Sequence, residues 1–158
     1  MKSAGFVAGL SLLAILGACA STSTTQLVSN IVRIDASAAP ACGASGARKL
    51  VTKMAAVETI RLGYDKYYIA GMDAQNNVRA IGANYNTTGT VSTFGNTASY
   101  SGYTTSTPII GGSQDAAIVA VMFKASDPEA ANAIDARAAL GPEWQAIVAN
   151  GSPNTCLE

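Results

Sequence analysis

Hydrophobic and polar positions follow two different periods in the first half of the chain, and these periods predict a strand, a helix and a second strand. Residues 27–34 alternate loosely between apolar and polar, which is typical of a strand. Residues 45–62 repeat apolar positions at helical spacing, with Ser45 suited to begin the helix and Gly63 to end it. The aromatic and β-branched residues 64–70 then predict a strand that packs back on the helix.

The second half of the chain predicts the centre of the sheet and two further helices. Residues 116–123 form a continuous apolar run of strand length, which indicates a strand covered on both faces or central in a sheet. Ser126 or Asp127 is expected to cap a helix over residues 128–140, which begins with proline and is rich in alanine. Residues 142–148 predict a last short helix.

A long uncharged segment separates these two halves. The residues between Arg79 and Asp115 are mostly Ser, Thr, Gly and Asn with spaced aromatic side chains. Structureless loops longer than about 12–15 residues are uncommon in a folded domain, so residues 80–114 are expected either to form short irregular edge strands or to be mobile. Loops on a rigid scaffold often carry recognition, so the aromatic residues of this segment are a candidate partner surface: Tyr85, Phe94, Tyr100 and Tyr103.

The N-terminus has the pattern of an export signal. Lys2 is the only charged residue before Arg33, and residues 5–18 are almost entirely apolar. A membrane-spanning helix needs about 20 apolar residues, and the polar run that starts at Ser21 begins too early for one. The pattern therefore predicts a secretory signal peptide.

The end of this segment, Leu16-Gly17-Ala18-Cys19, resembles the lipobox of bacterial lipoproteins. The resemblance implies that residues 1–18 are removed, that Cys19 becomes the acylated first residue, and that residues 19–26 form a lipidated tether before a single domain at 27–158. Ala20 differs from the aspartate that retains such proteins in the inner membrane, so the resemblance favours the outer membrane, facing the periplasm. The alternative is an ordinary signal peptide cut near Ala18 or Ala20.

The two remaining cysteines are expected to pair. If Cys19 carries lipid, Cys42 and Cys156 are left in a compartment that oxidises thiols, and a disulfide between them is predicted. It would close a loop of about 115 residues, for which the chain-entropy account gives about 4–5 kcal/mol of stabilisation. A metal site is the alternative, but it requires more than two thiolates and the chain has no histidine.

Composition weighs against several function classes. The chain has 158 residues, ten basic and ten acidic side chains and no histidine. A neutral chain without a basic block lacks the field that nucleic-acid binding requires. Without histidine, the usual general base and the Ser-His and Cys-His pairs are absent. We therefore expect no catalytic residue, no cofactor and no bound metal.

One charged pair is a candidate site. Glu58 and Arg61 lie three residues apart in the last turn of the first predicted helix and project near its apolar face. A partly buried carboxylate beside a guanidinium can bind or polarise a ligand. The alternative, which we favour, is a buried structural ion pair that positions the helix.

Further segments are similar to small uncharacterised proteobacterial lipoproteins. They are the block 55–67, which ends a helix in Gly-Tyr-Asp before an aromatic strand, and the shorter segments 122–124, 132–137 and 140–144. The resemblance implies a location and carries no activity.

The sequence thus predicts one α/β (α+β) domain with a small mixed sheet covered by two or three helices and held by one disulfide. The predicted function is that of a lipid-anchored envelope protein without catalytic activity, which acts through contacts with an envelope protein or the cell wall. Two alternatives stay open: a periplasmic small-ligand-binding lipoprotein, which would need an enclosed apolar pocket, and an adaptor subunit of an envelope or secretion assembly.

Overall fold

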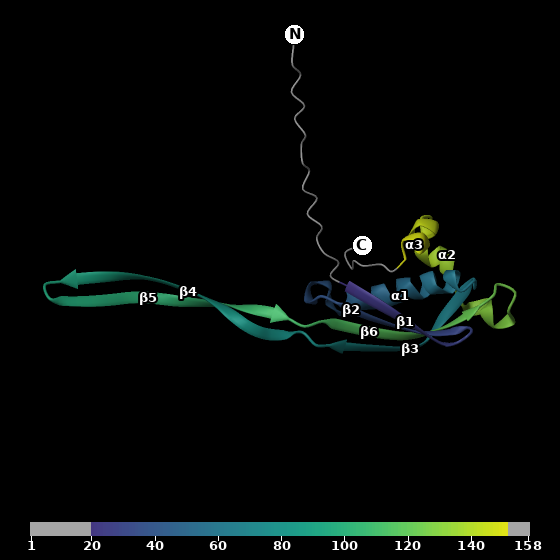
Figure 1. Cartoon of the computed structure of the whole chain (residues 1–158), viewed down its shortest axis with the longest axis horizontal. Helices are drawn as coiled ribbons and strands as arrows, with labels where there is room; N and C mark the ends of the chain where they lie inside the picture. The colour runs from purple at the N-terminus through teal and green to yellow at the C-terminus, as the bar shows by residue number, and fades with distance from the viewer. Residues whose placement is uncertain (1–19, 152–158) are drawn as a thin grey trace, which may run out of the picture.

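The computed structural model describes residues 20–151, of which 54% lie in strands and 30% in helices, so the predicted α+β class is confirmed. Five strands form one sheet in the order β1-β2-β6-β3-β7, and a two-stranded hairpin, β4-β5, extends far beyond it (Figure 1). All pairs of neighbouring strands are antiparallel, so the prediction of a mixed sheet is wrong. β2 and β3 run parallel to each other on either side of β6, and the first helix, α1, connects them.

The first two strands form a hairpin where a tether and one strand were predicted. β1 (Ala20–Val28) pairs with β2 (Ile31–Ala38) across a turn at residues 29–30, which falls inside the predicted strand 27–34. Residues 20–26, predicted to be a flexible tether, lie in β1. An edge strand needs only main-chain hydrogen bonds to its neighbour, so the Ser/Thr-rich β1 shows no apolar period by which it could be recognised.

The predicted central strand is confirmed, with one of its two faces covered. β6 (Gln114–Phe123) lies between β2 and β3 (Lys66–Asn76). Alternate side chains of β6 point toward α1 and are buried, namely Ala116, Ile118, Ala120 and Met122, while those between them are only partly buried. The continuous apolar run therefore reflects small and β-branched residues on both faces, and only one face has a helix packed against it.

Helix α1 (Gly43–Arg61) packs along this face and forms the core with it. It follows the short 3-10 helix η1 (Pro40–Cys42) and begins two residues before Ser45, without a side-chain cap. Gly63, with φ of +80°, ends the helix as predicted. The buried residues of α1 include Leu50, Val51, Met54, Val57 and Thr59, and they contact the buried side chains of β2, β3 and β6.

The C-terminal region is divided where one helix was predicted. Residues 128–140 form the 3-10 helix η2 (Pro128–Asn132), the two-residue strand β7 (Ile134–Asp135) and the short helix α2 (Ala136–Leu140). β7 pairs with the start of β3, and the Asp135 side chain accepts a hydrogen bond from the Ala138 N–H at 2.8 Å. The Asp135 cap and a strand contact thus override the helix propensity of the alanine-rich sequence. The last helix, α3 (Trp144–Asn150), is confirmed, and α2 and α3 lie on the α1 side of the sheet (Figure 1).

Candidate functional site

The most unusual element of the structure is the hairpin formed by β4 (Arg79–Phe94) and β5 (Thr97–Gly111), which we call the arm. It continues β3 and β6 beyond one end of the sheet, along the strand direction, and its own two strands are paired from base to tip (Figure 1). At about 3.3 Å per residue the arm is roughly 50 Å long. The predicted alternatives for residues 80–114, irregular edge strands or a mobile segment, are therefore both wrong, because the segment forms one long regular hairpin.

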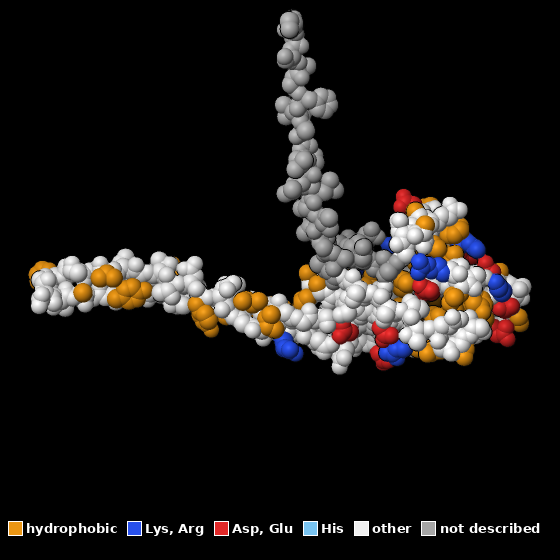
Figure 2. Space-filling view, in the orientation of Figure 1, with side chains coloured by type: hydrophobic (Ala, Val, Ile, Leu, Met, Phe, Trp, Pro, Cys, Tyr) orange, Lys and Arg blue, Asp and Glu red, His pale blue; other side chains and the backbone are white. Residues whose placement is uncertain are grey.

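The arm is open to solvent along its whole length. None of its residues is buried, and charged side chains gather on the body and at the base of the arm (Figure 2). The tip is a two-residue turn, Gly95-Asn96, with Gly95 at φ of +59°. A glycine in this first position fits the type II′ turn, whose twist matches that of paired strands. The local sequence thus specifies the hairpin, although none of its residues is buried.

The base of the arm is held by a network of amide groups. The Asn77 N–H donates to the Ser113 carbonyl at 2.9 Å, and the Asn77 side chain donates to the Asp115 carboxylate at 2.5 Å. The Asn76 side chain accepts hydrogen bonds from the Gln114 side chain at 3.0 Å and from the Val78 N–H at 2.9 Å. Hydrogen bonds from the Ser37 and Ser113 hydroxyls hold the pKa of Asp115 below its ordinary value, and the bond from Asn77 lowers it further by a smaller amount. Burial has the opposite effect on this pKa. These bonds fix the direction in which the arm leaves the sheet.

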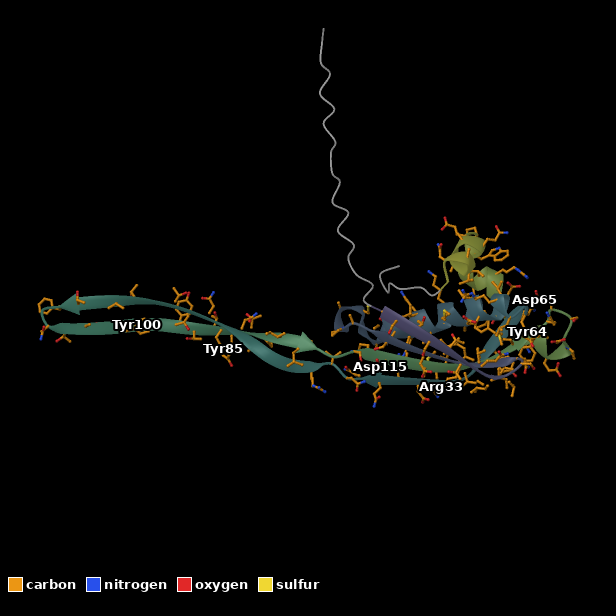
Figure 3. All side chains as sticks on the ribbon, in the orientation of Figure 1. Arg33, Tyr64, Asp65, Tyr85, Tyr100 and Asp115 are labelled. Atoms are coloured by element: carbon orange, nitrogen blue, oxygen red, sulfur yellow. The ribbon has the colours of Figure 1, made fainter. Side chains whose placement is uncertain are left out.

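The predicted aromatic surface is distributed over both faces of the arm. Tyr85, and Tyr100 opposite Val91, point to one face, whereas Tyr103 and Phe94 point to the other, as the strand register requires. All four are exposed, from 62% for Tyr100 to 92% for Phe94. Figure 3 shows Tyr85 and Tyr100 well separated along the arm. The structure therefore brings the four aromatics into one element but not into one cluster.

One tyrosine has a structural role in the arm. The ring of Tyr100 lies over the pair Gly89 and Gly102, and a Cβ atom built on either glycine would be 2.4 Å from its hydroxyl oxygen. An aromatic ring that covers paired glycines shields the backbone where no side chain can do so. Tyr100 thus stabilises the middle of the arm, a role that spacing alone did not indicate.

The two edges of the arm differ in the hydrogen bonds they offer. The residues of the closing pair Phe94–Thr97 point their main-chain N–H and C=O groups toward each other, because the pair flanks a two-residue turn. From there toward the base, pairs whose main-chain groups point inward alternate with pairs whose main-chain groups point outward. Pro108 falls on the outward position next to the base of the arm, where β5 therefore lacks a donor. The outward row of β4 contains no proline and no charged side chain from Ala83 to Thr93. β4 is therefore the more complete edge.

A second polar surface lies on the uncovered face of the sheet. Here a groove of about 840 Å³ is lined by the charged side chains Arg33, Asp35, Asp73 and Asp115 together with serine and alanine residues. Arg33 and Asp35 form an ion pair at 2.9 Å, and the hydrogen bond and charge of Asp35 raise the pKa of Arg33. Figure 3 shows Asp115 near the base of the arm. Among residues 20–151 no group of three or more His, Cys, Asp or Glu side chains is placed to hold a metal ion.

The predicted pair Glu58 and Arg61 is present, but it is not buried as a pair. Their side chains meet at 3.2 Å, with Glu58 13% and Arg61 44% exposed. An ion pair with one half-exposed partner is screened by water and contributes little to stability. The contact is consistent with the structural interpretation.

The charged residue Asp65 makes several contacts and was not singled out from the sequence. Its carboxylate accepts hydrogen bonds from the Ala125 N–H at 3.1 Å and from Arg137 at 3.0 Å, which hold its pKa below the ordinary value. Its main chain also bonds to Phe123 and Ala136. Asp65 thus joins β3, β6 and α2 at the end of the sheet opposite the arm (Figure 3). Its partners are far away in sequence, so no local motif marks it.

The cysteine predictions fall mostly outside the described residues. Cys19 and Cys156 lie in the ranges 1–19 and 152–158, which the structure does not describe. Cys42 is partly buried against the core at the start of α1. The lipid at Cys19 and the Cys42–Cys156 disulfide therefore stay predictions.

Comparison of the chain with protein-family models, with curated proteins and with solved structures finds no match. The resemblance to proteobacterial lipoproteins accordingly stays a prediction. No helix between residues 20 and 151 has the length and apolar character required to cross a membrane.

Proposed function

We propose that the protein is a lipid-anchored component of the outer membrane, without catalytic activity, that acts by protein contact and uses the arm as its contact surface. The observation that carries this proposal is the arm itself, a long hairpin with no buried residue, to neither edge of which any other strand of residues 20–151 is paired. An isolated two-stranded hairpin is marginally stable in water, and unpaired edges are templates for further strands. Such an element gains most of its stabilisation when a partner covers it.

The position of the arm relative to the proposed anchor supports this function. The register places Ala20, Ala38 and Gln114 in one row across the sheet, at the end from which the arm leaves. Cys19 immediately precedes Ala20, so lipid on Cys19 would hold this end of the sheet close to the bilayer. The arm then extends the reach of the anchored protein by roughly 50 Å. This arrangement suits a protein that contacts partners at or near the membrane, including an adaptor subunit.

The small-ligand alternative gains less support. It needs an enclosed apolar pocket with a few convergent polar groups. The groove on the open face is not enclosed, and it carries four charged side chains beside serine and alanine residues. A surface of this kind remains hydrated, which disfavours capture of an apolar ligand.

Photo-crosslinking in intact cells tests the contact surface. A photoreactive residue at Thr90 on the arm should give a discrete crosslinked product, whereas the same residue at Glu129, exposed on the body, should give none. Equal crosslinking from both positions, or none from the arm, would overturn the proposal.

The anchor and the disulfide have a separate test. Mass spectrometry of the protein extracted from membranes should show a chain that begins at Cys19 and carries acyl groups. Its mass after alkylation should increase by two alkyl groups only when a reductant is added first. An unmodified chain with two free thiols would contradict both predictions.

A further inference from the structure

We infer that the arm pairs with the arm of a second copy of this chain, β4 against β4, to give a four-stranded sheet with the order β5-β4-β4-β5. This inference rests on the proposed function, since it names the partner of the same surface. Two identical strands can pair in the antiparallel sense about a two-fold axis, so one sequence can supply both sides of the contact.

The chemistry of the β4 edge suits an identical strand. From Ala80 to Phe94 the strand carries no charge and no proline, and most of its residues are Thr, Ser, Asn, Val and aromatic types. Two copies therefore meet without electrostatic repulsion, and threonine side chains on adjacent strands form favourable pairs. Such a pair already exists within the arm, where the hydroxyls of Thr87 and Thr104 lie 2.8 Å apart.

The number of main-chain bonds is sufficient for a specific contact. Six residues of β4 turn their N–H and C=O outward, namely Ala83, Tyr85, Thr87, Gly89, Val91 and Thr93. If two copies overlap fully, crossing near Thr88, these rows exchange about twelve hydrogen bonds, compared with about ten in a typical protein interface. The two-fold axis stands perpendicular to the sheet, so Tyr85 and Val91 of both copies share one face and widen its apolar strip.

The other edge is less favourable for pairing with a further copy. In the four-stranded sheet both outer strands are β5, whose outward row has one donor fewer because Pro108 takes the position next to the base of the arm. Proline on an edge strand is a common means of preventing further strand addition. Pairing through β4 is therefore favoured over pairing through β5.

A matched pair of proline variants tests the inference. Thr87 and Thr104 face each other across the arm, and both turn their N–H outward, one on the β4 edge and one on the β5 edge. Thr87→Pro removes a donor from the proposed interface, and Thr104→Pro makes the same change on the opposite edge. Both lose the Thr87–Thr104 hydroxyl contact equally, so any effect on the hairpin itself is matched.

The readout is the dissociation constant for self-association of the full-length chain in detergent, obtained from native mass spectrometry over a concentration series. The wild type should form a two-copy species. Thr87→Pro should weaken self-association by roughly tenfold to thirtyfold, because the symmetric contact loses two bonds, while Thr104→Pro should leave it unchanged.

A monomeric wild type, equal effects of both variants or a stronger effect of Thr104→Pro would overturn the inference. The crosslinking experiment separates its failure from that of the proposed function. A monomer whose arm crosslinks in cells to a different protein or to cell-wall material leaves the contact function standing, whereas an arm that crosslinks to nothing refutes both.

Discussion

Removal of the arm provides a direct test of how the fold is divided. Replacing residues 78–112 by Asn-Gly joins Asn77 to Ser113 through a two-residue turn, and these two residues are already hydrogen-bonded at 2.9 Å. The five-stranded sheet and the contacts of α1 are untouched by this change, because no residue of the arm is buried. We expect the shortened protein to fold.

The size of the effect follows from loop length. Shortening a connection from 35 residues to two is about four halvings, and each halving favours closure by about 0.6 kcal/mol. If the hairpin contributes no net stability, the shortened protein is more stable than the full chain by up to about 2.5 kcal/mol. If the hairpin is stable by itself, the difference approaches zero.

The measurement is urea unfolding followed by circular dichroism, at a concentration where the full chain is monomeric. The slope of the transition should fall, because the shortened chain exposes less surface on unfolding. A loss of more than about 2 kcal/mol would refute the reasoning, since it would show that the arm and the sheet form one cooperative unit.

Three further predictions concern the body. Ile118→Ala should lower the free energy of unfolding by about 2–5 kcal/mol, because Ile118 is 1% exposed beneath α1. Val119→Ala, on the open face of the same strand, should lower it by no more than about 1 kcal/mol. Similar losses for the two variants in urea unfolding would contradict the one-sided core. The carboxyls of Asp65 and Asp115 have a pKa below the ordinary 3.8, so they stabilise the fold above that pH, and the free energy of unfolding should fall as the pH drops below about 4. The variant Asp65→Asn should be less stable than the wild type at neutral pH and should lose less stability on acidification. Identical acid profiles for this variant and the wild type would contradict the prediction. Glu58→Gln combined with Arg61→Met should change the free energy of unfolding by less than about 1 kcal/mol, and a larger loss would show that the pair is worth more than its exposure indicates.

Much of the body could be predicted from local pattern. Helix α1 has an apolar face and a terminal glycine, and β6 is an unbroken apolar run at the centre of the sheet. Both signals depend on burial, and burial leaves a period in the sequence. The helix predicted over 128–140 was wrong because the Asp135 cap and a strand contact with β3 decide its structure, and the contact involves residues about 70 positions apart.

The arm and β1 could not be predicted from the same signals. Neither packs an extended apolar face on the core, so their strands are rich in Ser, Thr and Asn without a polar–apolar period. The local signal for the arm, which the sequence analysis did not use, is the glycine at the tip with β-branched and aromatic residues on both sides. The four aromatic residues were placed in the right segment, but their division between two faces depends on a register that only the paired strands define.

Hydrogen exchange along the two edges of the arm tests the central claim most directly. In the assembled full-length protein, the outward amides of β4, at Tyr85, Thr87 and Val91, should exchange slowly, and those of β5, at Tyr100, Thr104 and Ser106, should exchange rapidly. Dilution to the monomer should abolish the difference. Rapid exchange on both edges at high protein concentration would contradict pairing through β4.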